Sequence, residues 1–139
     1  MPKVDFAILS DYVRVDGGIG HLVAGGIDTI FAQKVPAGQN IGLMLRVEFT
    51  RPECGRPHRI EVIFIDEDGA ELVKVSATGV PEWNESWPAE WQSKILFGFN
   101  FGIPLRRYGS YSFHILINDS EEKRLPVRVV PLELPNTDD

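Results

Sequence analysis

The sequence predicts an all-β protein, a Greek-key β-sandwich of immunoglobulin-like or C2-like kind with seven to nine strands. Three observations lead to this fold class. Apolar and polar residues alternate in several short runs, which is the period of a strand that buries one face. Gly, Pro, Asn or Asp separate these runs about every 10 residues, a spacing typical of sandwiches and barrels. No long stretch has the periodicity of a helix. A closed barrel is the alternative architecture.

The N-terminal part of the chain predicts short strands over residues 5–9, 12–15, 21–24 and 27–32. The glycine pair at 17–18 follows the second run and supplies the positive φ angles of a tight turn. A second glycine pair, at 25–26, interrupts the chain as a bulge or a close backbone approach does. Residues 36–38, which include a proline and a glycine, then form a loop.

The middle of the chain predicts strands over residues 43–49, 60–65 and 71–78. The first of these alternates strictly, whereas the second is almost entirely apolar and is typical of a central strand. Between them, residues 51–57 hold two prolines and a glycine, so we expect a surface connection. The sequence Asp-Glu-Asp-Gly at 66–69 turns the chain into the third strand and completes a hairpin.

Residues 81–91 are the least strand-like part of the chain, and we expect a loop with at most one helical turn, beginning at Pro88. The next strand, over residues 95–101, places Phe97, Phe99 and Phe101 on one face. We therefore expect this strand at the centre of the core. Pro104 is expected to end it.

A hairpin over residues 108–130 closes the predicted sandwich. Both of its strands alternate, and the connection begins at Asn118, Asp119 and Ser120, whose short side chains favour turns. Tyr108, near the start of the first strand, resembles the tyrosine corner of immunoglobulin-like domains. We expect the hairpin to stabilise the fold and any functional site to lie elsewhere. The chain forms one domain over residues 1–139, with a disordered tail at 133–139.

Composition excludes several classes of partner. The net charge of −6 disfavours nucleic acid and anionic membranes, and the basic residues form no block. No apolar run reaches the roughly 20 residues that span a bilayer. Asp5 and Asp11 interrupt any signal-peptide core, so we expect a cytoplasmic protein. The single cysteine, Cys54, rules out an internal disulfide and agrees with a reducing compartment.

Several short motifs carry a resemblance to a known family. They are residues 10–13 with the glycine pair at 17–18, residues 25–28, Pro57-His58-Arg59, and residues 108–111 with 125–127. Together they resemble a family of small bacterial proteins, each a single β-sandwich, that is defined only as a domain of unknown function. The resemblance covers most of the chain and implies the fold. It implies no established activity and no site residues.

The loop at 81–91 holds all 3 tryptophans of the chain, Trp83, Trp87 and Trp91. Pro88 lies between them, so one continuous helix through all three is not expected. In one interpretation the rings form an aromatic platform that binds a partner protein, a peptide or a sugar. In the other they fold back and close the open end of the sandwich. The sequence leaves both interpretations open.

Other candidate groups have weaker patterns. The histidines His21, His58 and His114 lack the close spacing of zinc ligands, and we expect them to be exposed or in cross-strand contacts. Cys54 with His58 as its base is a candidate nucleophile. Asp66 and Asp68 form a weak candidate for Ca²⁺, although a glycine turn already explains them. We predict no catalytic residue, no metal and no cofactor.

The functional expectation is a non-catalytic binding or assembly module. Its partner is a protein or a second copy of the chain, because apolar edge strands must be covered or paired and a homodimer achieves this. The tryptophan loop is the first choice of contact. One alternative is a small enzyme in which Asp11, Asp28, His21 and His58 converge. Another is a Ca²⁺-dependent, C2-like binding domain.

Overall fold

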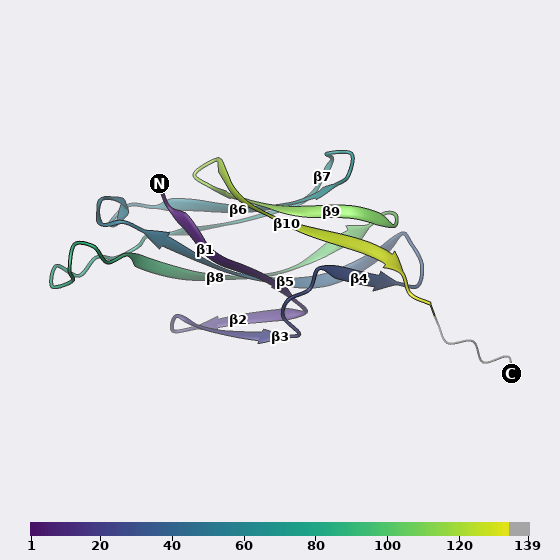
Figure 1. Ribbon diagram of the computed structural model, residues 1–139, viewed down its shortest axis with the longest axis horizontal. Helices are drawn as coiled ribbons and strands as arrows, with labels where there is room; N and C mark the ends of the chain where they lie inside the picture. The colour runs from purple at the N-terminus through teal and green to yellow at the C-terminus, as the bar shows by residue number, and fades with distance from the viewer. Residues whose placement is uncertain (134–139) are drawn as a thin grey trace, which may run out of the picture.

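The structure of the protein, a computed structural model, describes residues 1–133 and is all-β, as predicted (Figure 1). This part of the chain contains ten strands and one short 3₁₀ helix, so the prediction of seven to nine strands was too low. The predicted tail lies outside the described residues except for Glu133. The elements are β1 (Lys3–Ser10), β2 (Tyr12–Asp16), β3 (Ile19–Val23), β4 (Thr29–Ala32), β5 (Ala37–Phe49), η1 (Arg51–Glu53), β6 (His58–Asp66), β7 (Glu71–Gly79), β8 (Ser93–Leu105), β9 (Gly109–Ile117) and β10 (Ser120–Pro131).

The strands form three sheets that lie in layers. A five-stranded sheet has the order β4-β10-β9-β6-β7, and a three-stranded sheet has the order β1-β5-β8. The hairpin β2-β3 forms a third layer below the three-stranded sheet (Figure 1). Neighbouring strands are antiparallel throughout, except that β4 and β10 are parallel. The Greek-key connection stays a prediction.

The hydrophobic core lies between the five-stranded and the three-stranded sheets. Alternate residues of each strand supply it, as period-two patterning requires. The ring of Phe113 on β9 packs against Phe64 on β6, with 4.8 Å between centroids, and against Phe101 on β8, at 6.0 Å. Burial of each such side chain contributes about 1.5–3 kcal/mol. The core therefore joins the two sheets of the sandwich.

The predicted C-terminal hairpin is confirmed. Tyr111, Phe113, Ile115 and Ile117 of β9 are all buried. The turn is shorter than predicted, because only Asn118 and Asp119 lie outside the strands, with φ of 51° and 69°. These are left-handed values that Asn and Asp tolerate better than other residues. Ser120 already belongs to β10.

The tyrosine-corner prediction named the wrong residue. The hydroxyl of Tyr111 donates to the carbonyl oxygen of Arg107 at 2.7 Å and accepts from the backbone N–H of Arg107 at 3.1 Å. This is the local contact expected of a tyrosine corner. The Tyr108 hydroxyl instead donates to the carbonyl oxygen of Ala32, 76 residues away, and joins the residue before β9 to the end of β4.

Two strand ends differ from the prediction. β5 begins at Ala37, inside the predicted loop, and β8 continues through Pro104 to Leu105. Pro104 pairs with Gly38 on β5, and β8 has no neighbour on its other side within the three-stranded sheet. A proline that lacks an N–H is tolerated on an edge strand. β8 thus faces the core with its phenylalanines, but it is an edge strand and not a central one.

The β2-β3 hairpin, which we call the ribbon, is held on the outer face of the three-stranded sheet by one side-chain amide. Asn100 on β8 accepts from the backbone N–H of Val13 at 2.9 Å and donates to the carbonyl oxygen of Val13 at 2.7 Å. This pair of bonds replaces the neighbouring strand that β2 lacks on that side. Val13 and Met44 are 1% and 4% exposed, and they form a small second core beneath the ribbon.

Glycines on the outer face allow the ribbon to approach closely. A Cβ on Gly42 of β5 would lie 2.9 Å from the backbone nitrogen of Val13 and 3.0 Å from Oδ1 of Asn100. A Cβ on Gly98 of β8 would lie 2.9 Å from a methyl group of Val15. Carbon atoms in a close-packed interior lie about 3.5–4.0 Å apart at best. Side chains at either position would push the ribbon away from the sheet.

We expect Gly42→Ala to lower the free energy of unfolding by about 1–3 kcal/mol, because the new methyl group overpacks the Asn100–Val13 contact. Gly38→Ala is the matched control, since Gly38 lies on the same strand and a Cβ there meets nothing within 4 Å. Urea denaturation of both variants checks this. Equal stability of the two variants would contradict the proposed role of Gly42.

Candidate functional site

The tryptophan loop, residues 80–92, connects β7 to β8 and projects from one end of the sandwich beside η1, at the left of Figure 1. Two contacts hold it to the η1 segment. The backbone N–H of Gly55 donates to the carbonyl oxygen of Pro81 at 2.8 Å. Nη2 of Arg51 donates to a carboxylate oxygen of Glu85 at 2.6 Å. The loop is therefore anchored at its base by backbone and side chain.

Two successive turns replace the predicted helical turn. The N–H of Trp87 donates to the carbonyl oxygen of Asn84 at 2.9 Å, and the N–H of Trp91 donates to that of Pro88 at 3.1 Å. The side-chain oxygen of Asn84 also accepts from the N–H and hydroxyl of Ser86. Each turn ends on a tryptophan, and the rings are thereby brought to one side of the loop.

The three indole rings pack on one another, and we call them the tryptophan cluster. The centroids of Trp83 and Trp87 are 5.3 Å apart with an interplanar angle of 79°, and those of Trp87 and Trp91 are 6.2 Å apart at 46°. None of the three belongs to the core between the sheets, to the extent that the structure describes it. Trp91 is 53% exposed. The rings thus form a surface cluster and do not extend the core.

A hollow of about 590 Å³ lies beside the cluster. The Nε1–H of Trp83 is shielded from solvent and has no hydrogen-bond partner within residues 1–133. An unpaired buried donor is unfavourable by about 1–3 kcal/mol and is rare in folded proteins. The guanidinium of Arg51 lies 5.8 Å from the ring centroid of Trp83. The hollow is lined by Arg51, Cys54, Gly55, Val80, Pro81, Glu82, Trp83 and Glu85.

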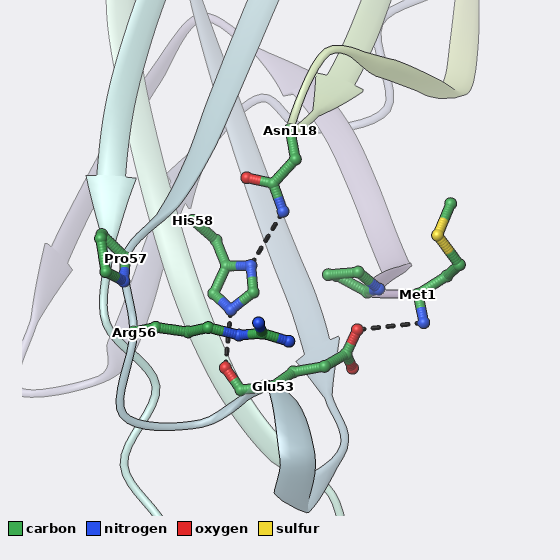
Figure 2. Close-up of a pocket in the computed structure, with 7 residues that line it drawn as sticks. Met1, Glu53, Arg56, Pro57, His58 and Asn118 are labelled. Atoms are coloured by element: carbon green, nitrogen blue, oxygen red, sulfur yellow. Dashed lines mark hydrogen bonds and ion pairs between the residues drawn. The ribbon is translucent and has the colours of Figure 1, made fainter.

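A second hollow, of about 360 Å³, is lined by residues that include His58, at the start of β6 (Figure 2). His58 is 4% exposed, so it is not an exposed histidine, and of the two predicted environments only the cross-strand contact remains. Its Nε2 lies 2.6 Å from the carbonyl oxygen of Glu53 and must carry the proton, because a carbonyl only accepts. Its Nδ1 accepts from the side-chain amide of Asn118 at 2.9 Å. Both ring nitrogens are therefore used in structural hydrogen bonds.

Glu53 is a buried carboxylate beside this hollow. One of its oxygens accepts from the N–H and the hydroxyl of Thr50, both at 2.8 Å, and the other lies 3.0 Å from the amino group of Met1. Burial raises the pKa of Glu53, but the bonds from Thr50 and the Met1 ammonium outweigh it and hold the pKa below its usual range. The ionised side chain fixes the η1 segment on which the tryptophan loop rests.

Cys54 does not have the surroundings of a nucleophile. Burial raises the pKa of its thiol, a hydrogen bond with Ser93 opposes this, and the nearby charge of Glu53 raises it further. The thiol donates to the carbonyl oxygen of Thr50 at 3.4 Å. The nitrogens of His58 are engaged by Glu53 and Asn118. The structure therefore gives no support to a Cys54–His58 pair.

The acidic turn proposed for Ca²⁺ has protein partners. The side chain of Asp66 accepts from the N–H groups of Asp68 and Ala70, at 3.0 and 2.9 Å. Asp68 forms an ion pair with Arg107. Within residues 1–133 no group of three or more His, Cys, Asp or Glu side chains is placed to hold a metal ion. Asp66 and Asp68 act here as turn and ion-pair residues.

Three of the four residues of the predicted small enzyme are not brought together. His21 lies on the ribbon, outside the three-stranded sheet, whereas His58 lies in the five-stranded sheet. Asp28 contacts its neighbour Thr29 and, through its carbonyl oxygen, the backbone N–H of Arg128. These contacts place His21, His58 and Asp28 in separate parts of the fold.

A chain of three polar side chains on the outer face of the five-stranded sheet was missed by the sequence analysis. Oγ of Ser112 lies 2.8 Å from Nε2 of His114, whose Nδ1 lies 3.3 Å from a carboxylate oxygen of Glu121. The pattern that could have indicated it is Ser and His two residues apart on one strand face. His114 thereby makes the cross-strand contact that was predicted for it.

This arrangement has the connectivity of a Ser-His-acid triad but lacks its electrostatic surroundings. The pKa of Glu121 is lowered mainly by a hydrogen bond from Arg124. The negative charge of the carboxylate is therefore already balanced by the guanidinium of Arg124. β9 is an interior strand that pairs with both β6 and β10. Its backbone N–H groups belong to the sheet ladders, and no pair of them is free to form an oxyanion hole beside Ser112.

Comparison with known proteins identifies a family. The "Family of unknown function (DUF6941)" matches residues 5–130. No curated protein sequence matches the chain. Among solved structures, the chain is similar to the Pseudomonas fluorescens alkylpurine DNA glycosylase AlkC bound to DNA containing an abasic site analog, with 9% identity and a TM-score of 0.47. The similarity covers 92% of this chain and 30% of the glycosylase chain. Within residues 1–133 no helix is long and apolar enough to span a membrane.

The lowered pKa of Glu53 predicts a pH dependence of stability. Its folded-state pKa lies below the unfolded value of about 4.3, so the ionised form stabilises the fold at neutral pH. This contribution is lost as the pH falls through the folded pKa. We expect Glu53→Gln to lower the free energy of unfolding by about 1 kcal/mol at pH 7, and we expect the difference from the unmodified protein to shrink as the pH falls below the unfolded pKa of Glu.

Urea denaturation between pH 7 and pH 3 measures this difference. Glu71→Gln serves as the control, because Glu71 is an exposed residue of β7. A Glu53→Gln variant with the same pH profile as the unmodified protein would contradict the assignment.

Proposed function

Since the chain belongs to the family of unknown function DUF6941, for which no activity is implied, we propose that it is a non-catalytic binding module. Its contact surface is the tryptophan cluster, and its partner is a protein. One observation carries this proposal: three tryptophans pack together on a loop outside the core, with the outermost ring 53% exposed. A fold stabilised by its two-sheet core has no need of such a cluster.

The energetics of an exposed indole favour a protein interface. A tryptophan side chain buries about 150–250 Å² when it enters a contact, and it does so with few rotatable bonds. Tryptophan is for this reason enriched among residues that dominate binding energy. Packing of Trp87 between Trp83 and Trp91 also fixes the rings before binding, so less conformational entropy is lost on association.

The geometry of the rings favours a polypeptide over a sugar. A sugar ring stacks on an open indole face, and a row of sugars needs rings that are nearly coplanar. Here the rings are inclined at 79° and 46°, and neighbouring side chains occupy part of their faces.

The charge of the tryptophan loop indicates the charge that a protein partner should carry. Residues 80–92 contain Glu82, Glu85 and Glu90 and no basic residue, and the whole chain carries a net charge of −6. A partner segment with Lys or Arg beside its apolar anchor is complementary to this loop, whereas a phosphate backbone is repelled. We accordingly propose a cytoplasmic protein partner and no nucleic acid.

Two features of the polar sites support a non-catalytic role. Both nitrogens of His58 are held by structural hydrogen bonds. The Ser112-His114-Glu121 chain lies on a flat sheet face without free N–H groups to stabilise an oxyanion.

We expect Trp91→Ala to weaken binding of the partner at least tenfold, which corresponds to about 1.4 kcal/mol. The thermal midpoint should change little, because Trp91 lies outside the core. The experiment is affinity capture from a lysate of the source organism, followed by calorimetry with the captured protein. Phe31→Ala is the control, since Phe31 is 61% exposed but lies on β4, far along the chain from the cluster.

Tryptophan fluorescence of the complex gives an independent readout. Contact with the cluster should shift the emission to shorter wavelength. Capture of the same proteins by Trp91→Ala and by the unmodified chain, with unchanged affinity, would overturn the proposal.

A further inference from the structure

The edges of the sheets are not equally protected against pairing with other strands. Proteins block edge strands with charged residues, proline, bulges or short length. Four of the six edge strands carry a charged residue, a proline or a bulge: Lys3 with a register shift after Val4 on β1, Arg14 and Asp16 on β2, Lys74 on β7, and Pro104 on β8. The other two, β4 with four residues and β3 with the five residues Ile-Gly-His-Leu-Val, contain no Lys, Arg, Asp, Glu or Pro and no bulge, and β3 is the longer of the two.

The outward face of β3 is apolar and exposed. Ile19 and Val23 are 66% and 57% exposed, and His21 lies between them on the same face. Tyr12, which pairs with Val23 across the ribbon, is 51% exposed. The side chains on the other face of the ribbon, such as Val13, pack on the three-stranded sheet.

Among residues 1–133, the backbone groups on one side of β3 have no hydrogen-bond partner. Gly17 and Gly18, with φ of 56° and 76°, form a two-residue turn, so the flanking pair Asp16–Ile19 is hydrogen-bonded. Hydrogen-bonded and non-hydrogen-bonded pairs alternate along an antiparallel ladder. Gly20 and Leu22 therefore direct their N–H and C=O groups away from β2.

On the β2 side of the ribbon the backbone groups alternate in direction in the same way, and the groups that point outward at Val13 already have hydrogen-bond partners. Val13 pairs with Leu22 across the ribbon, so its N–H and C=O also point outward, away from β3. Asn100 binds both of these groups. The Asn100 contact confirms the direction of the backbone groups and leaves β3 as the open edge of the ribbon.

We infer that two copies of the chain pair through β3, antiparallel, about a two-fold axis beside His21. In this register Gly20 of each copy forms two hydrogen bonds with Leu22 of the other, four in total. His21 faces His21 of the second copy as a non-hydrogen-bonded pair. Ile19 lies beside Val23 of the second copy. The inference goes beyond the proposed function and does not depend on the tryptophan cluster.

The sequence of β3 favours a second copy of the chain as the strand that pairs with its open edge. The outward residues read apolar, histidine, apolar in both directions, so an antiparallel copy matches apolar to apolar and His21 to itself. A shift of two residues would place His21 against an apolar residue and leave Ile19 or Val23 without a neighbour. The contact is small for a specific interface, so we expect micromolar or weaker association.

Cross-linking tests the register. In a Cys54→Ala background, His21→Cys places two thiols on opposite sides of the two-fold axis, at the short spacing of a non-hydrogen-bonded pair. Mild oxidation should yield a disulfide-linked dimer. Arg14→Cys is the matched control, because Arg14 lies directly opposite His21 on β2. The two Arg14 positions would be three strand spacings apart, about 14 Å, which no disulfide bridges.

Sedimentation equilibrium measures the association itself. Protein concentrations of about 10 to 500 µM cover the dissociation constant of a dimer that associates in the micromolar range. Ile19→Lys should raise the dissociation constant at least tenfold while the circular dichroism spectrum stays unchanged. Phe31→Lys and Trp91→Ala should leave the constant unchanged, which separates this surface from the tryptophan cluster.

Three results would overturn the inference. The first is a monomer at all concentrations with no His21→Cys cross-link, including the case in which β3 pairs only with a different protein. The second is a dimer that Ile19→Lys does not weaken. The third is equal cross-linking of the His21→Cys and Arg14→Cys variants.

Discussion

The docking of the ribbon on the three-stranded sheet is the contact on which the rest of the structure depends. The amide of Asn100 closes the edge of β2 by binding both backbone groups of Val13. Gly42 and Gly98 make room for this approach because they lack a Cβ. The three-stranded sheet is thereby covered on both faces, by the main core and by the ribbon. The same contact decides which strand edge stays open: β2 is bound to the sheet, and β3 is left at the surface.

The end of the sandwich that carries the tryptophan loop is organised by a buried carboxylate. Glu53 is held by Thr50 and stays ionised, which fixes η1 and the residues that follow it. The carbonyl oxygen of Glu53 orients the ring of His58, and the N–H of Gly55 holds the base of the tryptophan loop. The polar groups at this end thus hold η1 and the base of the tryptophan loop in place. The short connection between β5 and β6, which contains η1, therefore links the fold to the proposed binding surface.

The sequence predicted those elements whose pattern depends on burial in the main core. Alternation located β9, β10 and the middle strands, since period-two patterning records which face of a strand is apolar. The alternation could not show that Asn100 and Gly42 contact the ribbon. A polar residue and a glycine are expected on the outer face of a sheet whether or not another layer covers that face. The burial of His58 was missed for a similar reason: its partners are the carbonyl oxygen of Glu53 and an amide 60 residues away. The three tryptophans were identified, but their packing on one another depends on turns that composition does not specify.

Amide hydrogen exchange at two residues of the ribbon tests whether β2 is the closed edge and β3 the open edge. Val13 and Leu22 are paired across the ribbon, and their N–H groups point to opposite edges. We expect the Val13 N–H, bound by Asn100, to exchange at least about tenfold more slowly than the Leu22 N–H in dilute protein. We also expect exchange at Leu22 to slow as the protein concentration rises, while exchange at Val13 does not change. Equal protection of the two amides at every concentration would contradict both the closed edge of β2 and the open edge of β3.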